Sequence, residues 1–102
     1  MTDEKRKHKR VPAIADVVLE GLSGKYSART IDISAEGCFV DTLGLAQAGE
    51  KIKLKLTLPG GEIMEIWGEV TYRLDNVGFG LRFIDLSDAD RGRLEQFEKL
   101  RQ

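Results

Sequence analysis

Residues 52–58 read Ile-Lys-Leu-Lys-Leu-Thr-Leu, and this strict alternation of apolar and polar side chains constrains the fold more than any other feature of the chain. Successive side chains of a β-strand point to opposite faces of a sheet, so one face of this strand is buried and the other meets solvent. Pro59-Gly60-Gly61 follows the strand and predicts a tight hairpin turn. The pattern therefore predicts a sheet of antiparallel strands with one buried face.

Five further segments have the apolar and β-branched composition of short strands, and turn residues separate them. They lie at residues 13–21, 26–33, 38–42, 63–72 and 79–83. In the last of these, Phe79, Leu81 and Phe83 alternate, and Gly78 and Gly80 lie on the opposite face. Glycines at such positions suit a close approach of another backbone or a bend in the strand.

The end of the chain changes its apolar period from two residues to three. Ser87-x-x-Asp90 resembles the capping arrangement that starts a helix, with Asp in the place usually taken by Glu or Gln. Leu94, Phe97 and Leu100 then recur every three residues and predict the buried stripe of an amphipathic helix. Six short strands followed by one helix predict a mainly β domain, either a small antiparallel barrel or a sandwich, capped by the helix.

The 102 residues fit one domain, and their charge is unevenly distributed. Residues 1–10 hold five basic and two acidic groups, a net charge of +3, whereas residues 11–102 hold 11 basic and 15 acidic groups, a net charge of −4. We therefore expect a flexible basic arm over residues 1–10 and a single folded domain over residues 11–102. The basic arm predicts an anionic partner, and the acidic body argues against DNA or RNA binding.

Several classes of protein are not expected from this composition. Cys38 is the only cysteine and His8 the only histidine, so we expect no disulfide within the chain and no metal site. No nucleophile triad or phosphate-binding loop before a helix is present either, so we expect neither an enzyme nor a catalytic residue. The chain has no signal peptide and no long apolar run, so we expect a cytoplasmic protein that does not insert into a membrane.

Two polar clusters could bind a ligand. Arg6-x-x-x-Arg10 alone reads as a solvated basic tail, and Asp32-x-Ser34-x-x-Gly37 alone reads as a turn after a strand. Together they match the two edges of a guanine base. An arginine fork donates to the O6/N7 edge, whereas a carboxylate such as Asp32 accepts from the N1–H and N2–H₂ edge. A second arginine, or Ser34, can contact a phosphate.

In their order and spacing, these two clusters resemble the signature motifs of the PilZ domain family. The resemblance extends to Gly68-Glu69-Val70-Thr71-Tyr72-Arg73, to Gly78-Phe79-Gly80-Leu81-Arg82-Phe83 and to the closing helix, and it covers about residues 5–100. It implies a six-stranded antiparallel β-barrel with a C-terminal helix, from a bacterial protein. It also implies binding of the second messenger cyclic di-GMP, with no further cofactor.

The resemblance also implies roles for particular residues. Arg6 and Arg10 would bind guanine and phosphate from the arm, Asp32 and Ser34 would hold the base from the barrel, and Gly37 would permit the turn. The arm would become ordered when the ligand binds, and an unidentified downstream protein would read that change. An alternative is a PilZ-like barrel that binds a protein partner and no nucleotide.

Four further residues are weaker candidates for ligand contact. Lys5, directly before the first arginine, is at a position that influences ligand stoichiometry in the family. Tyr72 or Trp67 would stack on a base, and Arg73 would contact a phosphate. Because Trp67 and Tyr72 lie five residues apart on one predicted strand, we expect them to point to opposite faces.

Overall fold

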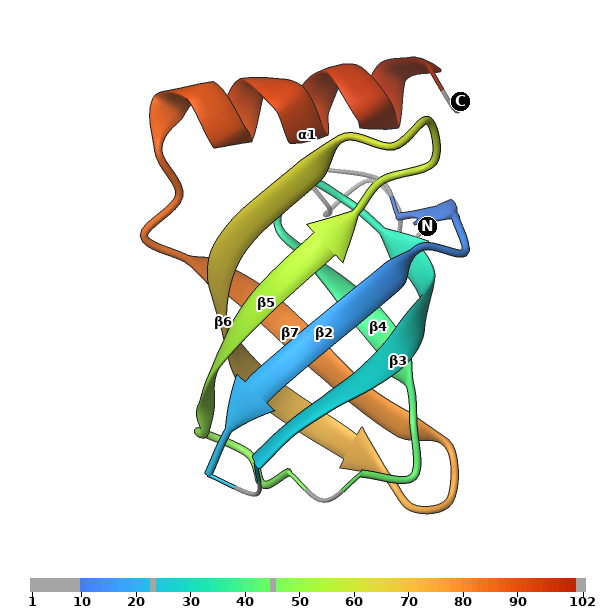
Figure 1. Ribbon diagram of the computed structural model, residues 1–102, viewed down its shortest axis with the longest axis vertical. Coiled ribbons are helices and arrows are strands. Elements are labelled where there is room, and N and C mark those ends of the chain that lie inside the picture. The colour runs from blue at the N-terminus through green and yellow to red at the C-terminus, as the bar shows by residue number, and fades with distance from the viewer. Residues whose placement is uncertain (1–9, 23, 45, 101–102) are drawn as a thin grey trace, which may run out of the picture.

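The computed structural model describes residues 10–100 except residues 23 and 45, and the sheet in it closes on itself (Figure 1). The strands follow the order β1-β3-β2-β5-β6-β7-β4, all neighbours are antiparallel, and pairing of β3 with β4 joins the two sides. The elements are β1 (Val11–Pro12), β2 (Asp16–Gly21), β3 (Gly24–Ile33), β4 (Gly37–Asp41), β5 (Lys51–Thr57), β6 (Ile63–Leu74), β7 (Gly78–Ile84) and α1 (Asp88–Leu100). The predicted six-stranded barrel with a C-terminal helix is confirmed, with β1 as a short additional strand.

The alternating segment forms β5, which lies between β2 and β6 in the barrel wall. Its apolar side chains Ile52, Leu54 and Leu56 are almost fully buried, whereas its lysines are exposed. Gly60 and Gly61, in the turn to β6, have φ values of 109° and 100°, which side chains with a Cβ rarely adopt. The hydrophobic core therefore fills the interior of the barrel, and the inward-pointing apolar side chains of the strands form it.

The first predicted strand, residues 13–21, is shorter in the structure, because β2 begins only at Asp16. Residues 13–15, between β1 and β2, leave the regular ladder. The buried side chain of Thr30 replaces part of that ladder, because its Oγ1 accepts from Ala15 N–H at 3.0 Å and donates to the Ala13 carbonyl at 2.8 Å. Side-chain hydrogen bonds of this kind compete with sheet pairing, and this one lets β1 turn onto the end of β3.

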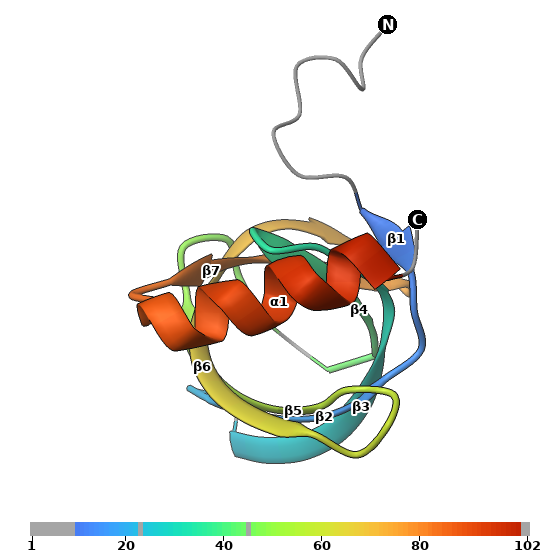
Figure 2. The ribbon, with the colours of Figure 1, turned by 90° about the horizontal axis from the view of Figure 1, so that it is seen from above.

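Helix α1 lies across one end of the barrel (Figures 1 and 2). The predicted cap is present, since Ser87 Oγ accepts from Asp90 N–H at 3.0 Å. Leu94 and Phe97 are buried against the barrel, but the prediction for Leu100 was wrong, because this side chain is 75% exposed at the helix end. The third buried residue of the helix is Glu98. A spacing of three and four residues, through 94, 97 and 98, therefore describes the packed face better than a spacing of three.

Candidate ligand-binding site

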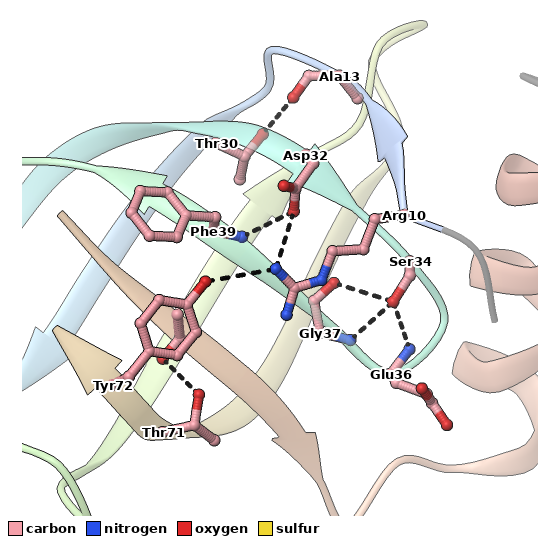
Figure 3. A network of polar contacts seen from close by, with 11 residues as sticks. Arg10, Ala13, Thr30, Asp32, Ser34, Glu36, Gly37, Phe39, Thr71 and Tyr72 are labelled. Atoms are coloured by element: carbon pink, nitrogen blue, oxygen red, sulfur yellow. Dashed lines mark hydrogen bonds and ion pairs between the residues drawn. The ribbon is translucent and has the colours of Figure 1, made fainter. Parts of the chain in front are cut away.

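A row of cross-strand neighbours over four strands forms the floor of the candidate site. Asp32 of β3 pairs with Phe39 of β4, Phe39 pairs with Gly80 of β7, and Gly80 pairs with Tyr72 of β6. Side chains at paired positions share one face of a sheet. This row therefore brings Asp32 and Tyr72, 40 residues apart in the sequence, to the same outer face of the barrel (Figure 3).

Two β-bulges put the polar ends of this row on the outside. In β3 the register shifts between Thr30 and Asp32, and in β6 it shifts between Val70 and Tyr72. An extra residue in a strand reverses the facing of the side chains that follow it. Thr30 and Val70 point inward and are buried, so regular strands would have buried Asp32 and Tyr72 as well.

The bulge in β6 makes one sequence prediction wrong. Trp67 and Tyr72 were expected on opposite faces, but both point outward and are 47% and 38% exposed. The extra residue is Thr71, whose hydroxyl donates to the Gly80 carbonyl at 3.3 Å. The regular alternation of side chains between the two faces of a strand is lost where a bulge inserts one extra residue.

Arg10 lies at the centre of the polar contacts (Figure 3). Its Nη1 donates to the Tyr72 hydroxyl at 3.5 Å and lies 3.9 Å from Asp32 Oδ1. The hydrogen bond with Tyr72, followed by the negative charge of Asp32, raises the pKa of Arg10 above its ordinary value, against the opposing effect of burial. The Arg10 guanidinium therefore keeps its positive charge at this site.

Asp32 also has a structural contact. Its Oδ1 accepts from Phe39 N–H at 3.2 Å, so the same oxygen faces both the backbone of β4 and the Arg10 guanidinium. The Asp32 and Arg10 side chains are 25% and 31% exposed. A partly exposed ion pair at 3.9 Å contributes little stability, so a ligand can replace it at small cost.

Gly80 fixes the position of the Tyr72 ring. A Cβ on Gly80 would lie only 2.4 Å from Tyr72 Cε1, so the ring lies directly over the glycine. The ring also contacts Phe39, with centroids 5.9 Å apart and planes tilted by 38°. The close backbone approach expected at Gly78 and Gly80 is present at Gly78, where a Cβ would lie 1.9 Å from the Val40 carbonyl oxygen, whereas at Gly80 the approaching group is the Tyr72 side chain.

The loop after β3 forms the other side of the site. Ser34 is 3% exposed, and its Oγ accepts from Glu36 N–H at 3.1 Å and from Gly37 N–H at 3.3 Å. The same hydroxyl lies 3.5 Å from the Gly37 carbonyl. The hydroxyl of Ser34 is thus used to shape the loop. This geometry matches the turn that the sequence pattern indicates.

Gly37 is required for a different reason from the one expected. It has no positive φ, so the turn itself does not need a glycine there. A Cβ at this position would instead lie 2.0 Å from the carbonyl oxygen of Leu81 in β7. Close contact between β4 and β7 excludes every side chain at position 37.

A pocket of about 410 Å³ opens beside Arg10. The loop of residues 34–37 forms one wall, and residues 81–83 of β7 form another. Arg82, and Arg91 from α1, also line it, together with two carboxylates, Glu36 and Asp85. Two of the three arginines have carboxylate partners that do not line the pocket, Asp32 at 3.9 Å from Arg10 and Glu69 at 2.8 Å from Arg82, so their charge is largely compensated. The guanidinium groups can each donate to the oxygens of an anionic ligand that replaces these partners.

The structure does not bring every candidate to this site. Trp67 lies opposite Lys53 and Ile84 and lines neither the pocket nor the contacts around Arg10. Arg73 forms an ion pair with Asp75 in the turn to β7, at 3.3 Å. Lys5 and Arg6 lie outside the described residues.

Phe39 and Glu98 also shape the site, although neither was a candidate from the sequence. Phe39 supports the Tyr72 ring, but its position showed only that it belonged to a strand. Glu98 of α1 accepts from Ala35 N–H in the loop at 3.0 Å. A signal for Glu98 was available, because a residue four positions after Leu94 lies on the buried face of the same helix.

Cys38 lies in the core and takes no part in the site. It is fully buried, and burial, with a smaller effect from Asp32, raises the pKa of its thiol from 9.0 to about 12. The thiol is therefore protonated at neutral pH and unreactive. Within residues 10–100, apart from 23 and 45, no group of three or more His, Cys, Asp or Glu side chains is arranged to hold a metal ion.

Comparison with known proteins identifies the family. The sequence pattern of the PilZ domain matches residues 4–99, nearly the whole chain. This chain belongs to the PilZ domain family. No curated protein matches it at a significant level. No helix in the described part of this PilZ domain is long and apolar enough to cross a membrane.

Three solved structures share the PilZ fold of this chain. The Bacillus subtilis inhibitor of motility MotI/DgrA has 24% identity and a TM-score of 0.84 over 96% of this chain, which spans about half (51%) of that protein. The PilZ domain of YcgR from Escherichia coli, solved with c-di-GMP, has 15% identity and a TM-score of 0.74, with 95% and 91% of the two chains covered. The PilZ domain of CeSA from a cellulose-synthesizing bacterium has 20% identity and a TM-score of 0.62, with 91% and 92% covered.

Proposed function

We propose that this PilZ domain binds cyclic di-GMP on the outer barrel face around Arg10 and Asp32, and that a partner protein reads the bound state. The observation that carries the proposal is the position of the Arg10 guanidinium, between the Asp32 carboxylate and the pocket beside loop 34–37 (Figure 3). A donor fork and a carboxylate acceptor, both partly exposed, thus adjoin a pocket lined by two further arginines, Arg82 and Arg91.

The chemistry of guanine fits this pair. Its O6/N7 edge only accepts hydrogen bonds, and a guanidinium meets two acceptors with two parallel donors. Its N1–H and N2–H₂ edge donates, and the Asp32 oxygen that neither Phe39 N–H nor Arg10 contacts, Oδ2, can accept from it. The arginines of the pocket can pair with the phosphates of a cyclic dinucleotide. The role is one of binding, without a catalytic step.

The family relationship supports the same ligand. The PilZ domain of YcgR, which shares this fold, has been solved with c-di-GMP. The present chain has both arginines of the first motif, of which Arg6 lies outside the described residues, and all three residues of the second. In our proposal Ser34 and Gly37 act by shaping the loop, because one hydroxyl bonds two loop N–H groups and the glycine allows β4 to contact β7.

We propose that the signal passes through the arm of residues 1–10. Ordering a chain segment costs conformational entropy, so the ligand must offset that cost by charge-assisted contacts with both arginines. Lys5, next to Arg6, would then influence how many ligand molecules the site holds. The surface formed by the ordered arm is what a downstream protein would bind.

Calorimetric titration with cyclic di-GMP, and with GMP for comparison, tests the proposal. Arg10→Ala removes the donor fork, and Asp32→Asn keeps an acceptor for Phe39 N–H while it removes the charge, so each variant should weaken binding by about tenfold or more. Arg93→Ala is the control, because it removes the same charge from the surface of α1, where Arg93 pairs with Glu62.

Two results would contradict the proposal. Wild-type protein that gives no heat and no spectral change with cyclic di-GMP would favour a barrel that binds only a protein partner. Unchanged affinity in both Arg10→Ala and Asp32→Asn would show that the ligand binds elsewhere.

A further inference from the structure

The four backbone N–H groups of loop 34–37 all have acceptors, and only one acceptor comes from a distant part of the chain. Ser34 N–H donates to the Gly37 carbonyl at 2.8 Å, and the N–H groups of Glu36 and Gly37 donate to Ser34 Oγ. Ala35 N–H donates instead to Glu98 Oε2 of α1 at 3.0 Å, across 63 positions of sequence. The conformation of the loop thus depends on a carboxylate of the C-terminal helix.

Both partners of this hydrogen bond are buried. Ala35 is fully buried and Glu98 is 7% exposed, next to Leu94 and Phe97, which hold α1 against the barrel end. A buried N–H group that loses its acceptor has no water to replace it, so the bond is costly to break. While α1 is packed against the barrel, Glu98 keeps Ala35 in position through this hydrogen bond. The motif residues on either side of Ala35, Ser34 and Gly37, are then kept in position as well.

The helix also reaches the pocket directly. Arg91, seven residues before Glu98, lines the pocket beside Ala35 and Glu36. The loop and the helix are therefore adjacent walls of one pocket, joined by the bond between Ala35 and Glu98. A movement of either wall changes the shape of the space next to Arg10.

We propose that Glu98 is a positioning residue for ligand binding, and that it couples the packing of α1 to the shape of loop 34–37. This inference rests on the proposed function, because it concerns the binding of cyclic di-GMP at that site. Glu98 acts through Ala35 N–H and does not touch the ligand. Helix α1 is then a second element, besides the arm, whose state depends on the ligand.

The coupling has two measurable consequences. If loss of the bond lets the loop leave its binding shape part of the time, the apparent dissociation constant rises in inverse proportion to the fraction of molecules that keep the binding shape, and the loss of one buried hydrogen bond makes this rise about three- to tenfold. Coupling between two events is reciprocal, so a ligand that favours this loop shape also holds α1 more firmly on the barrel.

The test compares three variants by calorimetry with cyclic di-GMP at a temperature at which all are folded. Glu98→Ala removes the acceptor and should weaken binding by about three- to tenfold. Glu98→Gln keeps an acceptor oxygen and should restore most of the affinity. Gln96→Ala, at an exposed position of the same helix, is the control and should bind as wild type does. Lower thermal stability with unchanged affinity in Glu98→Ala would overturn the inference and leave only a structural role.

Hydrogen exchange measured on the wild-type protein gives a second test, which does not depend on whether any variant folds. Cyclic di-GMP should slow the exchange of amides 94–98 of α1 as well as that of the β5 amides, which report opening of the whole barrel. Slowing of the β5 amides without any slowing of amides 94–98 would overturn the inference, since the helix would then open independently of the ligand. If the wild-type protein does not bind cyclic di-GMP at all, it is the proposed function that fails first. Binding without any effect of Glu98 leaves the proposed function intact.

Discussion

Replacement of Gly37 by alanine tests the tight contact between β4 and β7, where the binding loop joins the barrel. A Cβ at this position would lie 2.0 Å from the carbonyl oxygen of Leu81, and contacts below 3.0 Å are essentially never seen. The obstacle is a backbone atom in a paired strand, so it cannot rotate away as a side chain can. The two strands must separate by about an ångström where Gly37 pairs with Arg82 and Cys38 with Leu81.

The expected cost follows from that separation. One or two ladder hydrogen bonds are weakened, at about 0.5–1.5 kcal/mol each, and the displaced backbone adds about 1–3 kcal/mol of strain. We expect Gly37→Ala to lower the free energy of unfolding by about 2–4 kcal/mol. In a domain of this size, such a loss lowers the melting temperature by roughly 10–20 °C.

Urea denaturation and thermal melting measure this loss, and Gly92→Ala is the matched control. A Cβ on Gly92 of α1 meets nothing within 4 Å, and alanine favours a helix over glycine by up to about 1 kcal/mol, so the control should be at least as stable as wild type. A Gly37→Ala protein with the wild-type unfolding midpoint would refute the reasoning, since it would mean that β4 and β7 accommodate the methyl group.

Three further predictions concern the site, the core and the helix. Gly80→Ala should cost only about 1 kcal/mol of stability, because the Tyr72 ring can move away from the new methyl group. The ring then loses its place beside Arg10, so calorimetry should show weaker cyclic di-GMP binding, and full affinity would contradict this. Cys38 should resist thiol reagents at pH 8 until the protein unfolds. Its raised pKa means that the unfolded state loses the proton first, so its contribution to stability is complete below pH 9 and falls between pH 9 and about 12. Urea melts should show a decline of about 1.4 kcal/mol per pH unit there that Cys38→Ala lacks; the same decline in both proteins would assign it to other groups. Ser87→Ala removes the acceptor for Asp90 N–H and should cost about 1 kcal/mol in thermal melts, whereas Ser87→Asp should restore it; equal stability of all three proteins would show that the cap is unimportant.

Local patterns were sufficient to predict most elements of this fold, with the exception of the short strand β1. The alternation in residues 52–58 predicted β5, since a strand with one buried face needs only the order of its side chains. The cap at Ser87 and the pair Leu94 and Phe97 predicted α1 in the same way. Leu100 was assigned wrongly to the buried face, because whether a last turn is covered depends on what lies beside it.

It was harder to predict which side chains of the site point out of the barrel, because their orientation depends on β-bulges. Nothing in the residues around Thr71 distinguishes an added residue from a regular strand position, so Trp67 and Tyr72 were placed on opposite faces. The bulge is visible only once the pairing of Tyr72 with Gly80 is known. Pairing involves two segments, whereas alternation is a property of one.

The sequence alone determined which chemical groups are present and where they lie along the chain: a basic pair ahead of the barrel, Asp32 near the end of one strand, and Ser34 and Gly37 in the turn towards the next. It could do so because motifs and periodicity are local. Only the tertiary structure decided that Arg10 lies between Asp32 and Tyr72, that Gly37 is needed against Leu81, and that Glu98 holds the loop. These are contacts between distant segments, and they arise from barrel closure and the packing of α1, which no single stretch of sequence specifies.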